Sequence, residues 1–472
     1  MSRFKEANMS VCRRVVFVAF IVLVVVPIAR AGDSLDLTPQ YPEHAMTHVS
    51  IQLDVGGHDL VRGKSEDNEK PADKQLPSSV AAKLSYDELR VTEPGTTHAD
   101  SPLAIRCYDT AEAIIKIDQT GRTPKLPDDR RLIVLQQGEQ RPLLFCPDGL
   151  LDRGQLDLID VVGDSFVADL LLPTKPVADG DSWANDATVM GPLLTLDRIA
   201  VCEVQSVLDS FNYNYAKIRL AGTVHGTADG AAIEQEIRGV YLFDRHLHRV
   251  TRLNLAIREE RAIGSATPGL NAVAKVQIAI NPIEKSEHLT DDVVARVTGA
   301  ERTKGRDLSY ESPPLGFRLN HDRQWFVTAE AREAVTLRRM DNGDLAAQCT
   351  ITQLPSKSAG RQSSLEQFQK DIEYALGKNL AEVASSRQWQ NKAGLYCYEV
   401  IARGTVEEVP VEWHYYLVAP ESGPRVSVAV TMEAPMIDRV GTADRDLVES
   451  LQMFPAVPRV ETAAQPSDDT VK

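Results

Sequence analysis

The sequence predicts an α+β multidomain protein, in which a β-rich antiparallel N-terminal domain precedes an α/β/α-layered domain built on a second antiparallel sheet. Three observations support this fold class. The chain has 472 residues, well beyond the roughly 100–200 residues of a usual domain. Within residues 79–284, several segments alternate apolar and polar residues with a period of two, which is typical of strands with one buried face. Residues 315–455 combine similar strands with one strongly amphipathic helix, so a layered domain is expected there.

The first 31 residues have the parts of a cleaved signal peptide. Arg13 and Arg14 end a basic stretch, residues 15–28 are an apolar run, and Ala29-Arg30-Ala31 matches the small-x-small pattern of a peptidase site. The apolar run is shorter than the roughly 20 residues that span a bilayer, which argues against an uncleaved anchor. The expected mature chain begins at Gly32, has no integral membrane segment and is periplasmic or secreted.

The chain is acidic. Its formal charge is −15, and residues 1–31 carry five basic residues and one acidic residue, so residues 32–472 carry −19. Such a surface repels phosphate backbones, and nucleic-acid binding is not expected. Hydrophobic residues at 43% and charged residues at 25% are ordinary globular values, which exclude a wholly disordered chain and a polytopic membrane protein.

The β-rich domain is expected over residues 79–284. Short turn-rich joints separate its strands, which predicts a meander. The clearest strands are residues 215–220, 250–258 and 274–280, and a helix is expected near residues 150–161. Residues 32–78 contain one plausible strand and a polar stretch from residue 63, so this N-terminal segment is expected to be partly flexible.

Residues 285–314 lose the hydrophobic pattern and are expected to be an interdomain linker. The layered domain over residues 315–455 is centred on a helix that begins with a capping box, Ser363 to Glu366, and ends near Gly377. Leu365, Phe368 and Ile372 lie on one face of this helix. Three alternating strands and a closing helix follow, over residues 394–403, 409–418, 425–433 and 444–451. Residues 456–472 are polar and predict a disordered tail.

The C-terminal third resembles a known family. Phe317-x-Leu319 leading to Trp325, one amphipathic helix, three long strands and a closing segment are similar to the Mog1/PsbP-like domain. The resemblance implies a binding module without a catalytic motif. The β-rich domain is similar to the half-barrel lipoprotein carriers of the LolA/LppX type, which implies a concave sheet that holds lipid.

Five cysteines remain after Cys12 is removed with the signal peptide. Their spacing suggests one disulfide in each domain, Cys107–Cys146 and Cys349–Cys397, with Cys202 left buried. Connectivity does not follow from sequence, and buried free thiols are an equal alternative.

The sequence contains no motif that assigns a catalytic, cofactor-binding or metal-ligating residue. Gly-Asp-Ser begins at Gly32, Gly163 and Gly180, but none of the histidines has an aspartate three residues before it, so all three are interpreted as turns. His246 and His248 with Asp244 could share one face of a strand as metal ligands, but their segment is typical of a hairpin turn.

The aromatic run Trp413-His414-Tyr415-Tyr416 is the candidate interaction surface. On a strand, Trp413 and Tyr415 share one face while His414 and Tyr416 share the other. One face is expected to pack on the helix, and an exposed aromatic pair on the other would mark a binding surface. Core packing on both faces is favoured over this possibility.

These observations predict a non-enzymatic extracytoplasmic protein that acts in protein–protein interaction or envelope assembly, with an unidentified envelope or secreted protein as its partner and no cofactor. The first alternative is a carrier of apolar small molecules or lipids in the β-rich domain, and the second is a secreted hydrolase without a recognisable motif. A deep apolar cavity in the β-rich domain would favour the carrier, and an exposed aromatic patch on the C-terminal sheet would favour interaction.

Overall fold

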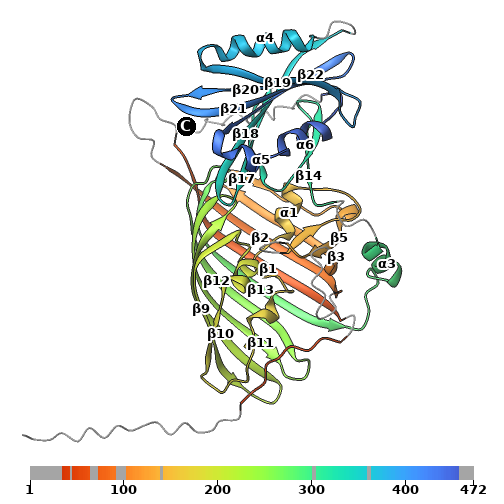
Figure 1. Ribbon diagram of the computed structural model, residues 1–472. Coiled ribbons are helices and arrows are strands. Elements are labelled where there is room, and N and C mark those ends of the chain that lie inside the picture. The colour runs from red at the N-terminus through yellow and green to blue at the C-terminus, as the bar shows by residue number, and fades with distance from the viewer. Residues whose placement is uncertain are drawn as a thin grey trace, which may run out of the picture.

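The computed structural model describes residues 34–42, 45–63, 73–91, 102–138, 142–299, 305–358 and 363–456. The expected signal peptide (residues 1–31) and nearly all of the expected tail lie outside the described residues. The chain is rich in antiparallel sheets, as the alternation predicted. Most of the N-terminal half forms a large curved sheet, and the C-terminal part forms a second, layered body above it (Figure 1).

The large sheet has twelve strands in the order β6-β5-β3-β2-β1-β13-β12-β11-β10-β9-β8, with β4 beside β3. Strands β9 to β13 form the predicted meander. β1 lies near the middle of the sheet, between β2 and β13, so the expected flexible segment 32–78 contains a central strand. The strands are β1 (Met46–Val61), β2 (Lys74–Arg90), β3 (Pro102–Ile117), β4 (Thr120–Arg122), β5 (Leu132–Gln136), β6 (Leu143–Phe145), β8 (Ser182–Asn185), β9 (Arg198–Phe211), β10 (Tyr215–Ala228), β11 (Ala231–Asp244), β12 (Arg249–Arg261) and β13 (Gly269–Ile283).

The concave face of this sheet is filled by the segment between β6 and β9. This segment contains α1 (Arg153–Ile159), η2 (Ala168–Leu171) and α2 (Ala187–Leu194), and η1 (Asp128–Arg130) precedes β5. Apolar residues of the segment and every second residue of the strands make one large core, which includes Leu156 and Met190 of the segment and Ile218 and Ile278 of the sheet. An Asp152–Gln155 capping box starts α1, within the range where a helix was expected.

The convex face of the sheet is covered in part by α3 (Asp291–Gly299). Leu289 and Val297 pack there on Leu89, Ile105 and Val134, which point away from the main core. The expected linker over residues 285–314 therefore contains a helix and, further on, strand β14 (Leu308–Ser312). Its few apolar residues are spaced for one short helix, a pattern too brief to stand out among the charges.

A small four-stranded sheet joins the two halves of the chain. Its order is β23-β15-β14-β7, where β7 (Leu151–Asp152) belongs to the N-terminal half and pairs in parallel with β14. The other two strands are β15 (Phe317–His321) and β23 (Gln452–Met453). Arg153 adds a hydrogen bond from Nη2 to the carbonyl oxygen of Arg323, at 2.5 Å. The domains are thus connected by backbone pairing as well as by the chain.

The C-terminal sheet has seven strands in the order β16-β17-β18-β22-β21-β20-β19. α4 (Leu365–Leu376) covers one face, and α5 (Ile437–Val440) and α6 (Ala443–Ser450) cover the other (Figure 1). The Ser364 side chain caps α4, one residue later than predicted, and Phe368 and Ile372 are buried beneath it. The remaining elements are β16 (Trp325–Glu330), β17 (Ala334–Asp341), β18 (Asp344–Lys357), η3 (Gly377–Asn379), β19 (Leu380–Gln390), β20 (Tyr396–Val406), β21 (Val409–Ala419), β22 (Gly423–Glu433) and η4 (Ala434–Met436).

The two expected disulfides are not formed, and all five cysteines in the described residues are free. Cys107 packs with the cluster on the convex face, whereas Cys146 belongs to the concave core. Cys349 in β18 and Cys397 in β20 are separated by β22 and β21. Three strand spacings amount to about 14 Å, and a disulfide requires Cα atoms within about 7 Å. Linear spacing carries no information on this separation across the sheet.

Candidate functional site

The aromatic run on β21 is not an exposed surface. Trp413 and Tyr415 pack toward α4, and Tyr416 belongs to the core on the α5 and α6 side of the sheet. Trp413, His414 and Tyr416 are buried and Tyr415 is half-buried. Helices cover both faces of the sheet, so the candidate interaction surface is not exposed, and the favoured expectation of core packing on both faces agrees with the structure.

His414 lies in a buried ionic cluster instead. Its Nδ1 is 2.5 Å from Oδ2 of Asp444 and its Nε2 is 2.8 Å from Oε1 of Glu412, while the Tyr416 hydroxyl donates to Asp444. Burial lowers the pKa of His414, but the two carboxylates outweigh it, so this pKa lies above its ordinary value. The imidazolium in turn overcomes burial and holds the pKa of Asp444 below its ordinary value. The cluster joins α6 to β21, and its burial assigns it a structural role.

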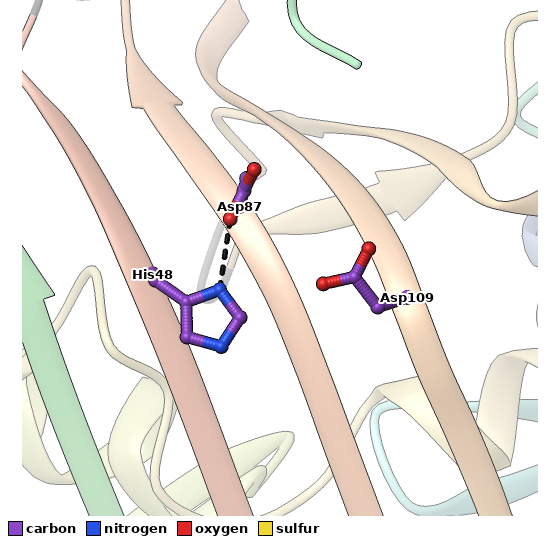
Figure 2. Close-up of side chains that lie close together, drawn as sticks. All are labelled: His48, Asp87 and Asp109. Atoms are coloured by element: carbon purple, nitrogen blue, oxygen red, sulfur yellow. Dashed lines mark hydrogen bonds and ion pairs between the residues drawn. The ribbon is translucent and has the colours of Figure 1, made fainter. Parts of the chain in front are cut away.

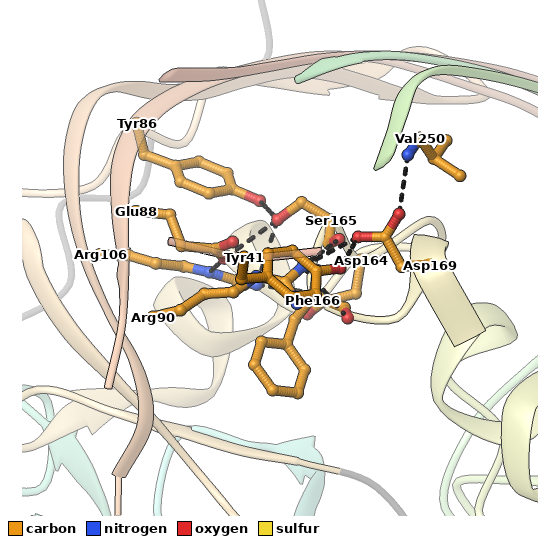
Figure 3. A network of polar contacts seen from close by, with 10 residues as sticks. All are labelled: Tyr41, Tyr86, Glu88, Arg90, Arg106, Asp164, Ser165, Phe166, Asp169 and Val250. Atoms are coloured by element: carbon orange, nitrogen blue, oxygen red, sulfur yellow. Dashed lines mark hydrogen bonds and ion pairs between the residues drawn. The ribbon is translucent and has the colours of Figure 1, made fainter. Parts of the chain in front are cut away.

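The segment that contains Gly163-Asp164-Ser165 crosses the concave face of the large sheet. Arg106 of β3, only 2% exposed, donates from Nε to Glu88 at 2.7 Å and from Nη2 to Asp164 at 2.6 Å. Ser165 donates to Glu88 at 3.0 Å, and its hydroxyl is 2.9 Å from that of Tyr86 (Figure 3). The motif interpreted as a turn is therefore anchored by a buried ion pair between β2 and β3.

Arg90 of β2 extends the network toward the next turn of this segment. Its guanidinium lies over the rings of Tyr41 and Phe166, at 4.2 and 4.7 Å from their centroids. Asp169 accepts from the backbone N–H of Val250 at 2.7 Å and lies 3.5 Å from Arg90 (Figure 3). The segment from Gly163 to η2 is thus attached to β2 and β3 in one half of the curved sheet and to β12 in the other half. Phe166 is held in place by a cation–π contact.

This fixed segment forms one wall of an open cavity of about 480 Å³. The other walls are the beginning of β3, helix α2 and the beginning of β9, so the cavity lies where the two ends of the curved sheet approach each other. Its surface is mainly apolar, with Leu103, Phe166, Val167, Leu170, Leu196 and Ile199 among the lining residues. Val167 and Leu196 are buried, whereas Leu170 is 55% exposed.

A cleft of about 680 Å³ with a mixed polar and apolar lining adjoins this cavity, and Gln137, Pro142 and Asp197 line both. The cleft lies between the domains, because Arg153 and Asp160 line it from the N-terminal half and Arg323 and Phe326 from the C-terminal half. Both arginine and aspartate side chains line it. The two spaces together offer an apolar compartment next to a compartment with both charges.

One sequence signal could have revealed the Arg106 network: two charged residues fall on the apolar face of their strands. Glu88 and Arg106 occupy positions that alternate with apolar residues, with Tyr86 two residues before Glu88 and Tyr108 two residues after Arg106. A charge on the buried face of a strand is rare unless it is paired. The partners are distant in sequence, so the pairing itself could not be foreseen.

Asp244, His246 and His248 belong to the turn between β11 and β12, as expected. Asp244 accepts from the backbone N–H groups of His246 and Leu247, at 2.9 and 3.0 Å. The carboxylate therefore caps the turn. His246 lies 3.1 Å from Asn214.

Comparisons with known proteins give weak likenesses. No protein-family model matches the chain, and no curated protein matches it. CyanoP, the cyanobacterial PsbP of Synechocystis sp. PCC 6803, is 13% identical, and its match has a TM-score of 0.25 and covers 32% of this chain and 93% of that one. A crystal structure from Bacteroides thetaiotaomicron VPI-5482 is 11% identical at a TM-score of 0.24, and the match spans 31% of this chain and 47% of that one.

Outer-membrane proteins also occur among the matches. The translocator domain of the autotransporter NalP from Neisseria meningitidis is 6% identical at a TM-score of 0.12, over 83% of this chain and 89% of that one. The weak PsbP-like resemblance predicted from the sequence is confirmed, and it concerns the fold alone. Among the described residues, every helix is too short or too polar to cross a lipid bilayer.

Proposed function

We propose that the N-terminal domain is a carrier of an apolar or amphiphilic small molecule, bound in the cavity between the 163–171 segment, α2 and β9. The observation that carries this proposal is a mainly apolar, open cavity of about 480 Å³. Ligand pockets usually have roughly 300–1,000 Å³ and a mostly apolar lining with a few polar groups. The aromatic residues of β21, whose exposure would have favoured a protein–protein interaction, are buried or half-buried. The alternative of a carrier is therefore favoured.

The adjoining cleft supports an amphiphile rather than a plain hydrocarbon. An acyl chain in the cavity would bring its polar head to the cleft, whose lining includes Arg153, Arg323 and Asp160. The Arg106 network supports this function indirectly. It fixes the wall that carries Phe166 and Val167, so the cavity is formed before the ligand arrives and little ordering is needed on binding.

A location outside the cytoplasm is part of the proposal. Its support is the sequence of residues 1–31, with a basic stretch, an apolar run and a peptidase site. N-terminal sequencing of the exported chain is expected to give Gly32 as the first residue. An intact Met1 on membrane-bound protein would contradict this expectation.

The binding proposal is tested by titration with an apolar fluorescent probe, 1-N-phenylnaphthylamine, and by competition with palmitate. Leu170→Glu places a charge on the exposed part of the wall, and we expect it to weaken probe binding at least tenfold. Val273→Glu is the matched control, because Val273 is a similarly exposed apolar residue on the opposite face of the sheet (48% against 55%). Equal probe affinity in both variants, or no displacement by palmitate, would rule out the proposed cavity.

A further inference from the structure

Three potential metal ligands meet on the convex face of the large sheet, away from the proposed cavity. His48 lies on β1, Asp87 on β2 and Asp109 on β3, so they come from three neighbouring strands (Figure 2). His48 and Asp87 are direct cross-strand partners, and Nδ1 of His48 is 2.9 Å from Oδ1 of Asp87. One ligand atom from each residue lies within 4.8 Å of the other two.

A β-bulge brings the third residue into place. In the pairing of β2 with β3, Ser85 is opposite Thr110 and Tyr86 is opposite Tyr108, so Asp109 is the extra residue. Bulges redirect a side chain and are frequent beside functional sites. Here the bulge lets Tyr108 remain in the buried concave core while Asp109 lies on the convex face beside Asp87.

The proposed ligands His48 and Asp87 each have a further hydrogen-bond partner. The hydroxyl of Ser85 is 3.1 Å from Nε2 of His48, and Ser286 donates to Oδ2 of Asp87 at 2.6 Å. The same Ser286 hydroxyl accepts from the backbone N–H of His288, whose Nε2 is 3.7 Å from Oδ1 of Asp109. Supporting hydrogen bonds of this kind orient metal ligands and fix the tautomer of a ligating histidine.

We propose that His48, Asp87 and Asp109 bind one divalent transition-metal cation, with His288 at the edge of the site as a fourth ligand. A neutral imidazole and two carboxylates bring a charge of −2, which a divalent cation neutralises. Bonds of about 2.0–2.2 Å in a tetrahedral site hold the ligand atoms about 3.4 Å apart, so the group, whose ligand atoms lie within 4.8 Å of one another, must contract by up to about 1.4 Å on binding. Nitrogen ligands favour zinc or its neighbours over magnesium and calcium, which prefer oxygen alone.

The contacts of His48 allow either tautomer, and one of them suits a metal. When Nε2–H donates to Ser85, the lone pair of Nδ1 faces the two carboxylates and is free for a metal. The reverse tautomer would give a Ser85-His48-Asp87 series with the connectivity of a hydrolytic triad. Ser85, however, lies within β2, which is paired on both sides at this residue, so neighbouring backbone N–H groups serve the sheet and cannot stabilise an oxyanion.

The experiment is zinc binding by the full chain after treatment with EDTA, measured by competition with a chromophoric chelator. We expect one tight zinc equivalent, and magnesium in hundredfold excess should not displace it. His48→Ala and Asp109→Asn should each lower zinc affinity at least thirtyfold, and Ser286→Ala about tenfold. Asp109 is 42% exposed, so its variant is expected to fold, and thermal melting without metal verifies this.

The matched control is His225→Ala on β10. His225 lies 3.8 Å from Glu234, and the described residues gather no third ligand there, so this variant should bind zinc like the unaltered chain. The proposal is overturned if the folded, unaltered chain takes up no tight zinc, or if Asp109→Asn binds zinc as tightly as His225→Ala does. Binding of the apolar probe concerns the other face of the sheet and should not change in His48→Ala, which separates this test from that of the cavity.

Discussion

At the scale of single residues, the N-terminal domain has charged side chains at buried positions of its sheet that apolar residues usually occupy. Arg106 and Glu88 are both buried on the concave face, and Asp164 and Ser165 complete their hydrogen bonds. Burial of a charge is unfavourable unless it is paired. The network therefore adds little net stability over an apolar core, but it fixes the path of the 163–171 segment because no other arrangement satisfies these groups.

Removal of one member of this network is expected to be costly. Arg106→Ala leaves the Glu88 carboxylate buried without its cation, and we expect a loss of about 3–5 kcal/mol in the free energy of unfolding. Arg258→Ala on β12 is the matched control, since its pair with Glu260 is exposed and should contribute less than about 1 kcal/mol. Urea unfolding of both variants measures the difference. Similar losses in the two would show that the Arg106 pair is not desolvated.

The His414 cluster predicts a pH dependence for the C-terminal domain. The folded-state pKa of His414 lies above the unfolded value of about 6.5, because Asp444 and Glu412 outweigh burial. Its contribution to stability is therefore complete below about pH 6.5 and is lost as the pH rises through the folded-state pKa. Urea midpoints of the C-terminal domain should decrease from pH 6 to pH 8. The decrease should be smaller in His414→Gln, and an unchanged slope in that variant would contradict the assignment.

At the scale of elements, the sequence predicted what periodicity and capping determine. The strands with clean alternation, the α1 region and α4 were found where expected, because each is set by residues close together in the chain. The helix α3 and the central position of β1 were missed. A short helix in a charged stretch gives little periodicity, and the order of strands in a sheet depends on contacts between residues far apart in sequence.

Helix α4 should be held to its sheet by a few apolar side chains. Phe368 is 9% exposed and packs with Val400 and Leu417, so Phe368→Ala is expected to cost roughly 3–5 kcal/mol. Tyr374 on the same helix is 89% exposed, and Tyr374→Ala should change stability by less than about 0.5 kcal/mol. Thermal unfolding followed by circular dichroism compares them. A small effect of Phe368→Ala would mean that α4 is docked loosely.

At the scale of the whole molecule, neither candidate site could be predicted from the sequence. The cavity takes its walls from β3, the 163–171 segment, α2 and β9, and the proposed metal site takes ligands from three strands and support from residue 286. No motif connects such residues, since each contributes one side chain and the spacing between them is set by the curvature and register of the sheet. The sequence could supply only the classes of function to be weighed.

The C-terminal domain has its own core, and a fragment of residues 305–456 is expected to fold alone. Trp325, Val430 and Leu447 pack within it, and contacts with the N-terminal half include the short β7–β14 pairing and the hydrogen bonds of Arg153. Loss of these contacts should lower its melting temperature by several degrees without removing cooperativity. Near-ultraviolet circular dichroism and calorimetry test this. A fragment without a cooperative transition would show that the domain requires its neighbour.

The central position of β1 in the sheet affects how the chain folds during its synthesis. β1 pairs with β13, so residue 46 meets residue 283 only after about three fifths of the polypeptide has been synthesised. Until then the nascent chain carries two incomplete sheets, each with a long unpaired edge that can join a neighbouring chain. We expect truncations that end before residue 269 to aggregate during expression. With this strand order, the large sheet cannot be completed until late in synthesis.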